Sequence, residues 1–361
     1  MKRLRTGVTT GLCAAAAAKA AALMLFSPEP VVQIEVTAKT GEAIAFEVTD
    51  ATWENGAAKC AVQKDAGDDP DVTNGAKIFA AVSKTNNGRI EIDGGEGIGR
   101  VTKPGLKVPV GKAAINPAPM EMISAAIEEI CKQNCCTGGV KAVISIPGGE
   151  NIAKKTMNER LGIVGGLSIL GTTGIVEPMS DRAIIETIKA DIDVRTATGS
   201  KSLLITPGNY GRDFASASLG LDVDEAVKCS NFIGETLDYI CMKRVENITL
   251  IGHAGKLVKL AGGVMNTHSK IAGCRMEIIT AHCALAGAGV ETAKQIMECA
   301  TTEAAIEILK PLGVNDAVWE SIGRKIGFHL NDRTKGSVII EYIVFTQDHG
   351  ILTRGKVGGR T

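Results

Sequence analysis

The chain has 361 residues, which is enough for two domains, because a single hydrophobic core stops growing near roughly 250–300 residues. Its 40 Lys and Arg residues balance 40 Asp and Glu residues, so no net charge attracts nucleic acid or an anionic membrane. No apolar run approaches the length that spans a bilayer. The composition therefore predicts two domains and neither a nucleic-acid nor a membrane partner.

The N-terminus, "MKRLR" followed by "LCAAAAAKAAALMLF", has the basic head and apolar body of an export signal. Lys19 interrupts the apolar body, and Thr9 and Thr10 ahead of it supply hydroxyls that cap helices. Alanine also has the highest intrinsic helix propensity. We therefore expect a buried helix over residues 11–26, with an export signal as the alternative.

The ten cysteines form no C-x-x-C pair and no framework typical of secreted proteins. This pattern indicates reduced thiols in a cytoplasmic protein. Cys131, Cys135 and Cys136 form the only cluster, and a metal site there is the alternative interpretation.

The first half of the chain consists mainly of strand-like runs. "VVQIEVTA" and "AIAFEVTD" flank a polar turn at 39–42 and predict a hairpin. A helix is expected over 119–134, after Pro117 and Pro119. Further strands are expected at 57–64, 76–83, 89–93 and 140–146. The first domain is therefore expected to be α+β with a mainly antiparallel sheet.

The stretch "RIEIDGGEGIGRV" resembles a dinucleotide-binding loop at first sight. The glycines are spaced G-x-G-x-G instead of G-x-G-x-x-G, and Pro104 and Pro109 exclude a helix immediately afterwards. The motif therefore fails as a Rossmann loop. Its glycines still permit close approach of backbone N–H groups to an anion.

A second loop, "ISIPGGENIAKKT" at 144–156, nearly matches a phosphate-binding loop. The phosphate motif requires Gly where Lys154 stands, followed by a helix, and the next residues do not look helical. The longer segment 147–178 is rich in glycine and lacks a helical period, and long irregular segments in compact proteins are usually functional. We interpret 144–156 as a basic loop, with a phosphotransferase as the second hypothesis.

Four carboxylates lie close together in "KDAGDDPDVT", at positions 65, 68, 69 and 71. Because they repel one another, they require a cation, backbone donors or basic side chains as partners. A structural turn and a functional site are equally compatible with this pattern. Asp65 is the member that we select as a candidate catalytic residue.

The second half alternates strands and helices. A polar helix is expected over 180–197, followed by a strand at 202–206, a helix near 231–243 and a strand at 247–251, with more helices after that. The tail predicts a strand pair that turns at 348–350. This order predicts βαβ units around a small parallel sheet, that is, an α/β domain. We place the boundary near residue 195, which gives domains 1–195 and 196–361.

Two turns, "LLITPGNYGRD" and "TLIGHAGKLVK", follow strands of this second domain. Ligands of open α/β sheets bind outside the carboxyl ends of the strands, where the strand order reverses. Lys256 and Arg212 are placed to contact carboxylates, and His253 is either a base or a hydrogen-bonded structural residue, with His268 in the same region. The candidate nucleoside-binding residues are Thr206, Gly208, Asn209, Gly211, Gly252 and Gly255.

Together these loops resemble a known family. "TGVTTGLCAAAAAKAA", "VQKDAGDDPDVTNGA", "GGEGIGRVTKPGLKVPVGKAAINPAP", "ISIPGGENIAKKTMNERLGIVGGLSILGTTGIVEPMS" and "IGHAGKLVKLAGGVMNTHSK" are similar to sequences of the CbiD family, the cobalt-precorrin-5B C(1)-methyltransferases. The resemblance covers nearly the whole chain. Leu12 is one departure, since a small residue is expected there, and it puts a hydroxyl role at that position in doubt.

The resemblance implies methyl transfer from S-adenosylmethionine to C-1 of cobalt-precorrin-5B, giving cobalt-precorrin-6A in anaerobic cobalamin synthesis. It also implies a first domain similar to a permuted ribosomal-S5-like fold. The partners implied are the methyl donor and the cobalt tetrapyrrole, and a homo-oligomer is compatible with the sequence. A phosphotransferase and a non-catalytic tetrapyrrole or cobalt carrier are the rival hypotheses.

The substrate implied by the resemblance carries many acetate and propionate groups, so its site needs distributed cations and backbone donors. Basic residues in the glycine-rich loops meet that need, and we expect some of them to be ordinary solvated charges. The substrate-binding candidates are Arg100, Lys103, Lys154, Lys155 and Arg160. His253 and Asp65 are the candidate catalytic residues, each as a proton acceptor.

Overall fold

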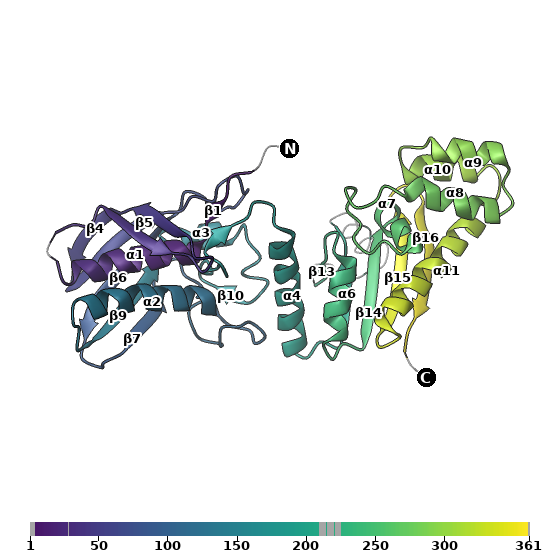
Figure 1. Cartoon of the computed structure of the whole chain (residues 1–361). Coiled ribbons are helices and arrows are strands. Elements are labelled where there is room, and N and C mark those ends of the chain that lie inside the picture. Colours follow the sequence, from purple (N-terminus) through teal and green to yellow (C-terminus); the bar gives the residue numbers. More distant parts are fainter. Residues whose placement is uncertain (1–3, 28, 209–213, 215–219, 221–224, 360–361) are drawn as a thin grey trace. The chain divides into compact units, whose positions relative to one another are not determined.

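The computed structural model describes residues 4–27, 29–208, 214, 220 and 225–359. Contacts divide the chain into two compact units, an N-terminal unit, Met1–Asp181, and a C-terminal unit, Arg182–Thr361 (Figure 1). The division falls at the start of helix α4 (Asp181–Ala197), whereas the boundary expected from the sequence lies near its end. Ile188 and Ile192 explain the difference, because both are buried in the core of the C-terminal unit.

Helix α1 (Thr10–Met24) is the centre of the N-terminal unit and confirms the buried helix expected at this position. The hydroxyl of Thr9 caps it by accepting a hydrogen bond from the Leu12 N–H at 3.2 Å. Its alanines are fully buried, because the helix packs on α2 (Pro117–Gln133) and on the sheet at the same time. The small side chains permit this close packing on several sides.

The sheet of the N-terminal unit has five strands. Their order is β4 (Thr49–Glu54), β5 (Ala57–Gln63), β6 (Lys77–Thr85), β9 (Gly139–Ser145) and β7 (Ile90–Gly94). All pairs are antiparallel except β7 with β9, so the sheet is mixed. Helix α2 forms the crossover between these two parallel strands and, with α1, covers one face of the sheet (Figure 1). The expected hairpin is present as β2 (Gln33–Thr37) and β3 (Ala43–Glu47).

The glycine-rich segment contains elements that the sequence pattern did not show. Helix α3 (Gly149–Ala153) lies in the region that was expected to lack helix. The sequence did not predict it, because one turn is too short to show a helical period. Two short antiparallel pairs also link distant segments. These pairs are β1 (Gly7–Val8) with β11 (Ile175–Val176), and β8 (Arg100–Val101) with β10 (Ile163–Val164).

The C-terminal unit also contains a five-stranded sheet. Its order is β13 (Val227–Lys228), β12 (Ser202–Thr206), β14 (Asn247–His253), β15 (Ile339–Thr346) and β16 (Gly350–Val357). The first four strands are parallel and β16 is antiparallel to β15, so the small sheet expected to be parallel is mixed at its last strand. The chain moves from β12 to β13 on one side and then returns to β14 on the other. Strand order therefore reverses at β12.

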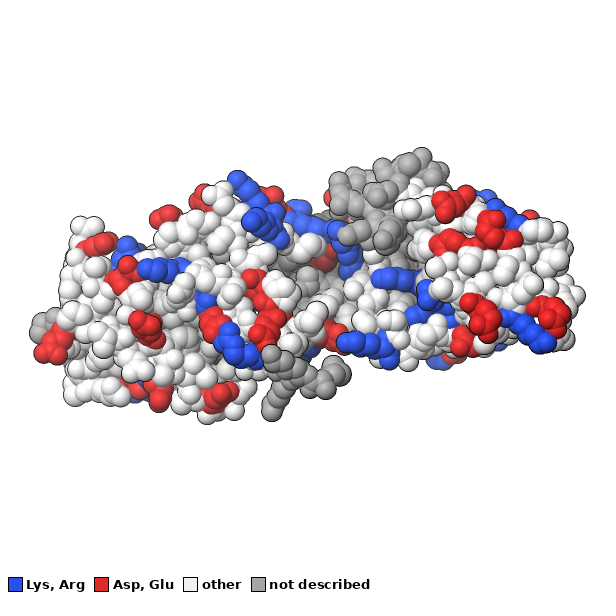
Figure 2. Space-filling view, turned by 90° about the horizontal axis from the view of Figure 1, so that it is seen from above, with Lys and Arg blue, Asp and Glu red and all other residues white. Residues whose placement is uncertain are grey.

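Helices connect and cover these strands. Helix α6 (Ile233–Cys241) joins β13 to β14, and α11 (Asn315–Thr334) packs on β15 and β16. The other helical segments are α7 (Ala254–Leu257), the 3-10 segment η1 (Val258–Gly262), α8 (Arg275–Leu285), α9 (Val290–Met297) and α10 (Thr302–Leu309). None of the helices in the described part of the chain is both long and apolar enough to cross a membrane. Basic and acidic side chains are interspersed on the surface of each unit in the view of Figure 2.

The glycines of "GGEGIGRV" serve close packing between backbones. Gly97 has φ +71°, and a Cβ atom there would lie 1.9 Å from the carbonyl oxygen of Ile146. Gly149 and Gly166 also lie directly against Gly97. Only residues without a side chain permit three loops to meet at this point.

We expect Gly97→Ala to lower the free energy of unfolding by roughly 3 kcal/mol or more, because it combines a disfavoured φ with a backbone collision. Gly88→Ala is the matched control: Gly88 has φ +66°, but no atom lies within 4 Å of its added Cβ. The control should cost only about 1–2 kcal/mol. Equal losses for the two variants in urea unfolding would show that loop packing at Gly97 is unimportant.

Candidate functional site

A crevice lies at the carboxyl ends of β12 and β14, where strand order reverses. Pro207 and Gly208 follow β12, the segment 252–256 ends β14 and begins α7, and Thr302 and Glu303 begin α10. The crevice has a volume of about 250 Å³ and is also lined by Arg275 and Thr301. We call it the strand-end crevice. Its position is the one at which open α/β sheets bind ligands.

His253 is held on both sides of its ring. It caps α7, because its Nδ1 accepts a hydrogen bond from the Gly255 N–H at 3.1 Å. Its Nε2 lies 2.9 Å from Oε1 of Glu303. An accepting Nδ1 places the proton of the neutral ring on Nε2, which donates to the carboxylate. His253 therefore has to exchange one of these partners before it accepts a proton.

Glu303 supplies a carboxylate that the sequence interpretation missed. Burial raises its pKa, but hydrogen bonds from its own backbone N–H and from the Thr302 hydroxyl, together with His253 and His349, leave the pKa below its ordinary value. Glu303 is therefore ionised at neutral pH and accepts hydrogen bonds. The sequence did contain a signal for a helix start at this point, because Thr301 is a helix-capping residue and an acidic residue follows it in the first helical turn.

The candidate nucleoside-binding residues have different surroundings. Among the described residues, a Cβ at Gly208 would meet only Nζ of Lys256, at 3.7 Å, whereas a Cβ at Gly252 would lie 2.8 Å from Leu257 and 2.9 Å from Pro207. Gly252 thus makes room for packing of the protein itself. Thr206 is buried at 2% exposure and does not line the crevice. Asn209 and Gly211, like Arg212, fall outside the described residues.

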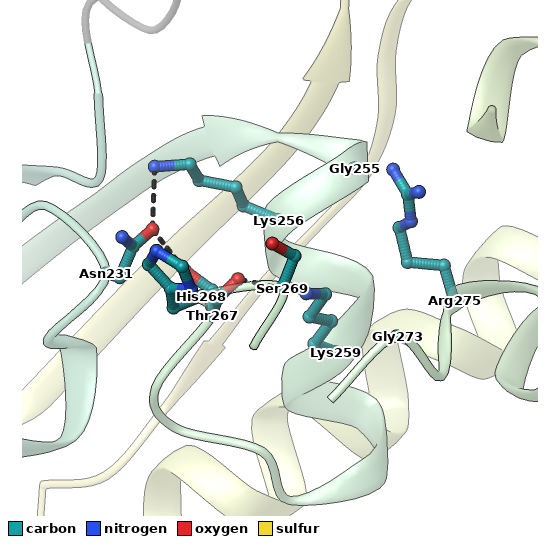
Figure 3. Close-up of a pocket in the computed structure, with 9 residues that line it drawn as sticks. All are labelled: Asn231, Gly255, Lys256, Lys259, Thr267, His268, Ser269, Gly273 and Arg275. Carbon is teal, nitrogen blue, oxygen red and sulfur yellow. Dashed lines mark hydrogen bonds between the residues drawn. The ribbon is translucent and has the colours of Figure 1, made fainter. Parts of the chain in front are cut away.

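A second hollow adjoins the crevice and shares Gly255, Lys256 and Arg275 with it. Its volume is about 300 Å³, and we call it the basic cavity. Lys256 extends from α7, Lys259 from η1 and Arg275 from the start of α8 (Figure 3). The other lining residues are Asn231, Thr267, His268, Ser269 and Gly273.

The two lysines of the basic cavity carry perturbed pKa values. Burial lowers the pKa of Lys256, and the neighbouring charge of Lys259 lowers it further. Burial also lowers the pKa of Lys259, with a further contribution from Arg275. Such clusters of mutually repelling cations are typical of functional sites.

The basic candidates of the N-terminal unit lie in adjoining loops. Pairing of β8 with β10 brings Arg100 and Lys103 beside the segment 160–164, where Lys103 packs against Gly162. Arg100 forms an ion pair with Asp93 at 2.9 Å. Arg160 lies at the start of the same segment, two residues before Gly162. Distributed cations are thus present in these loops, and Arg100 is ion-paired with an acidic residue.

The loop 144–156 does not have the geometry of a phosphate-binding loop. Lys154 follows α3 as its C-cap, and Lys155 and Thr156 come after it, whereas a phosphate loop places these residues before a helix. Nζ of Lys154 donates to the side-chain oxygen of Asn151 at 3.2 Å. The phosphotransferase hypothesis therefore loses the motif on which it rested.

The four carboxylates of "KDAGDDPDVT" have partners within the N-terminal unit. Asp65 binds Arg5 through both carboxylate oxygens, at 2.5 and 2.8 Å, and accepts a hydrogen bond from the Gly67 N–H. Asp68 and Asp69 accept from the backbone N–H groups of Arg5 and Met179. Asp71 pairs with the buried Lys64 at 2.6 Å. The loop thus connects the start of the chain to the end of the unit.

The comparisons with known proteins show the family of this chain. The CbiD family model matches residues 1–178, and the model of the CbiD C-terminal domain matches residues 266–356. The cobalt-precorrin-5B C(1)-methyltransferase of Ruminiclostridium cellulolyticum is 52% identical over 345 residues, 96% of this chain and 90% of that protein. The enzyme of the same name from Alkaliphilus metalliredigens is 43% identical over 359 residues, 99% and 94% of the two chains.

The chain therefore belongs to the CbiD family. A crystal structure of the cobalamin biosynthesis protein cbiD from Archaeoglobus fulgidus is 31% identical in sequence, with a TM-score of 0.41. The similarity covers 75% of this chain and 84% of that one.

The Asp65 ion pair predicts how stability depends on pH. The hydrogen bond from Arg5, followed by that from Gly67, lowers the pKa of Asp65 to about 2. A lowered carboxyl pKa contributes stability that is complete above the unfolded value of about 3.9 and is lost as the pH falls towards 2. We expect Asp65→Asn to lower the free energy of unfolding at pH 7 and to make the acid loss shallower.

Asp348→Asn provides the control for Asp65→Asn, because Asp348 is exposed in the turn between β15 and β16. Urea unfolding between pH 7 and pH 2 measures both variants. If Asp65→Asn follows the wild-type curve throughout, the ion pair does not stabilise the fold and the loop has another purpose.

Proposed function

We propose that this chain transfers a methyl group from S-adenosylmethionine to C-1 of cobalt-precorrin-5B, giving cobalt-precorrin-6A in anaerobic cobalamin biosynthesis. The observation that carries the proposal is its 52% identity, over 96% of the chain, to a cobalt-precorrin-5B C(1)-methyltransferase. The chain is thus an enzyme, a methyltransferase of cobalamin biosynthesis. A carrier without catalysis has no comparable support.

We place the methyl donor in the strand-end crevice. The Gly208 backbone offers close approach to a nucleoside, and the ionised Glu303 accepts hydrogen bonds from hydroxyl groups such as those of a ribose. The donor supplies a methyl group already activated by a sulfonium charge. The task of the protein is to align that methyl with the accepting carbon at near-attack distance and to exclude water.

We assign the substrate carboxylates to the basic loops of the N-terminal unit. Lys154 and Lys155 are exposed after α3, and Arg100, Lys103 and Arg160 lie near β8 and β10. Charge-assisted hydrogen bonds from such residues contribute about 1.5–3 kcal/mol each. Several such bonds would hold a polyanionic macrocycle even though the protein as a whole carries no net positive charge.

Of the two candidate proton acceptors, we favour His253. Asp65 has a pKa of about 2 and is therefore a weak base at neutral pH. His253 lies at the strand-end crevice and is oriented by the carboxylate of Glu303. Loss of its Gly255 contact would free Nδ1 to accept a proton, while Glu303 would stabilise the resulting imidazolium.

Two further assignments accompany this function. The permuted ribosomal-S5-like fold proposed for the N-terminal unit is supported by the family resemblance and by a mixed sheet covered on one face by α1 and α2. The cytoplasmic location is supported by the ten cysteines, which are all free thiols. Cell fractionation would test the location. Size-exclusion chromatography would test whether the protein is a homo-oligomer.

The function is tested by incubating the purified protein with cobalt-precorrin-5B and S-adenosylmethionine labelled in its methyl group. We expect a corrinoid product heavier by one methyl group that carries the label. An unlabelled, unchanged corrinoid recovered from folded protein and verified substrate would reject the proposed function.

The same assay tests the substrate loop. Lys154→Gln with Lys155→Gln should raise KM for the corrinoid roughly tenfold and leave KM for the donor unchanged, because a charge-assisted contact contributes at least 1.5 kcal/mol. Lys132→Gln with Lys141→Gln removes two exposed lysines from α2 and β9 and is the matched control. Equal KM values in the two double variants would assign Lys154 and Lys155 to the solvated surface.

A further inference from the structure

The basic cavity contains three cations that have no acidic partner in the described part of the chain. Among the residues that the structure describes, no Asp or Glu forms an ion pair with Lys256, Lys259 or Arg275. Lys259 is only 4% exposed, and the charge of another cation, Arg275, acts on it and lowers its pKa. By contrast, the buried Lys64 of the N-terminal unit is paired with Asp71.

The two lysines that line the cavity are oriented by hydrogen bonds to uncharged oxygens. Nζ of Lys259 donates to the carbonyl oxygens of Thr267 and Ala272, at 2.9 and 2.8 Å. Nζ of Lys256 donates to the carbonyl of Pro207 at 2.6 Å and to the side chain of Asn231 at 3.0 Å. An ammonium group has three donors, so the bonds to described residues leave one donor of each lysine for a ligand. Figure 3 shows the Lys256 contact with Asn231.

Carbonyl and amide oxygens orient an ammonium group but do not neutralise it. Bringing three cations together at a partly closed surface is unfavourable unless an anion compensates them. The rigid positions of Lys256 and Lys259 on consecutive helical segments keep the two charges close even though they repel each other. The most direct physical reason for such an arrangement is an anionic ligand.

We propose that the basic cavity is a carboxylate-binding site, in which Lys256, Lys259 and Arg275 together hold the anionic group of a ligand that extends into the strand-end crevice. The two hollows adjoin, because Gly255, Lys256 and Arg275 line both of them. The choice of a carboxylate rests on the proposed function, because both of its reactants carry carboxylates. The donor has one on its amino-acid end, and the tetrapyrrole has several on its periphery.

Binding of a simple carboxylate tests the site without reference to methyl transfer. We would titrate malonate by calorimetry at constant ionic strength into the wild type, Lys259→Met and Arg275→Gln. Lys270→Gln is the matched control, since Lys270 is an exposed lysine of the same loop that does not line the cavity. Malonate should bind the wild type and the control equally and bind the other two variants at least tenfold more weakly.

Three further ligands identify the source of the carboxylate. S-Adenosylhomocysteine carries the amino-acid carboxylate, whereas 5′-methylthioadenosine keeps the nucleoside and lacks it. A loss confined to S-adenosylhomocysteine in the cavity variants would assign the donor, and a loss confined to a cobalt corrinoid carboxylic acid would assign the substrate. Either result supports the proposal.

The proposal is overturned if malonate, S-adenosylhomocysteine and the corrinoid carboxylic acid all bind the cavity variants as they bind the wild type. It is also overturned if the wild type prefers inorganic phosphate to malonate. Circular dichroism of each variant separates a binding loss from unfolding, and Arg275→Gln retains a test if Lys259→Met does not fold. If malonate binds as expected but the protein transfers no methyl group, the proposed function is rejected and the carboxylate site in the basic cavity is retained.

Discussion

Parallel pairing of β12 with β13 on one side and β14 on the other is the constraint on which the candidate site depends. Because these strands run in the same direction, the turns after β12 and β14 emerge at the same edge of the sheet. The reversal of strand order at β12 separates them enough to leave a crevice. His253 and Gly208 therefore approach each other although 45 positions separate them in the sequence.

Charge compensation distinguishes the two clusters of ionisable residues. In the N-terminal unit, each carboxylate of the 65–71 loop meets a cation or a backbone N–H, so the loop is complete without a ligand. In the basic cavity, the cations meet neutral oxygens and one another. The same reasoning that assigns a structural purpose to the Asp65 loop thus assigns a binding purpose to Lys259.

Local patterns in the sequence predicted most of the fold. The alanine run of α1, the strand "SLLIT" and the pair β15 and β16 follow directly from propensity and apolar periodicity. Helix α2 begins at Pro117, two residues before the expected start, because proline is accommodated in the first turn. Helix α3 and the two-residue strands were missed, since elements this short show no period and form through long-range contacts.

The site was predicted less completely than the fold. The turn containing His253 was found because it directly follows an apolar strand, and the strand-end rule applies to it. Glu303 and Arg275 come from helices farther along the chain, and no spacing in the sequence connects them with that turn. Lys259 lies within the stretch "TLIGHAGKLVK" itself but was not selected as a candidate. Gly252 lines the crevice, as its sequence context suggested, and its missing side chain also accommodates Leu257, which the sequence did not indicate.

The central claim is that the methyl donor binds at the strand ends of the C-terminal unit. Calorimetric titration of S-adenosylhomocysteine against Gly208→Leu tests it most directly, because Gly208 lines the crevice and an added Cβ would meet only Lys256 within the described part of the chain. Gly289→Leu is the control, since its surroundings are open at the start of α9. The account predicts at least a tenfold loss of affinity for Gly208→Leu alone, and wild-type affinity in that folded variant would contradict it.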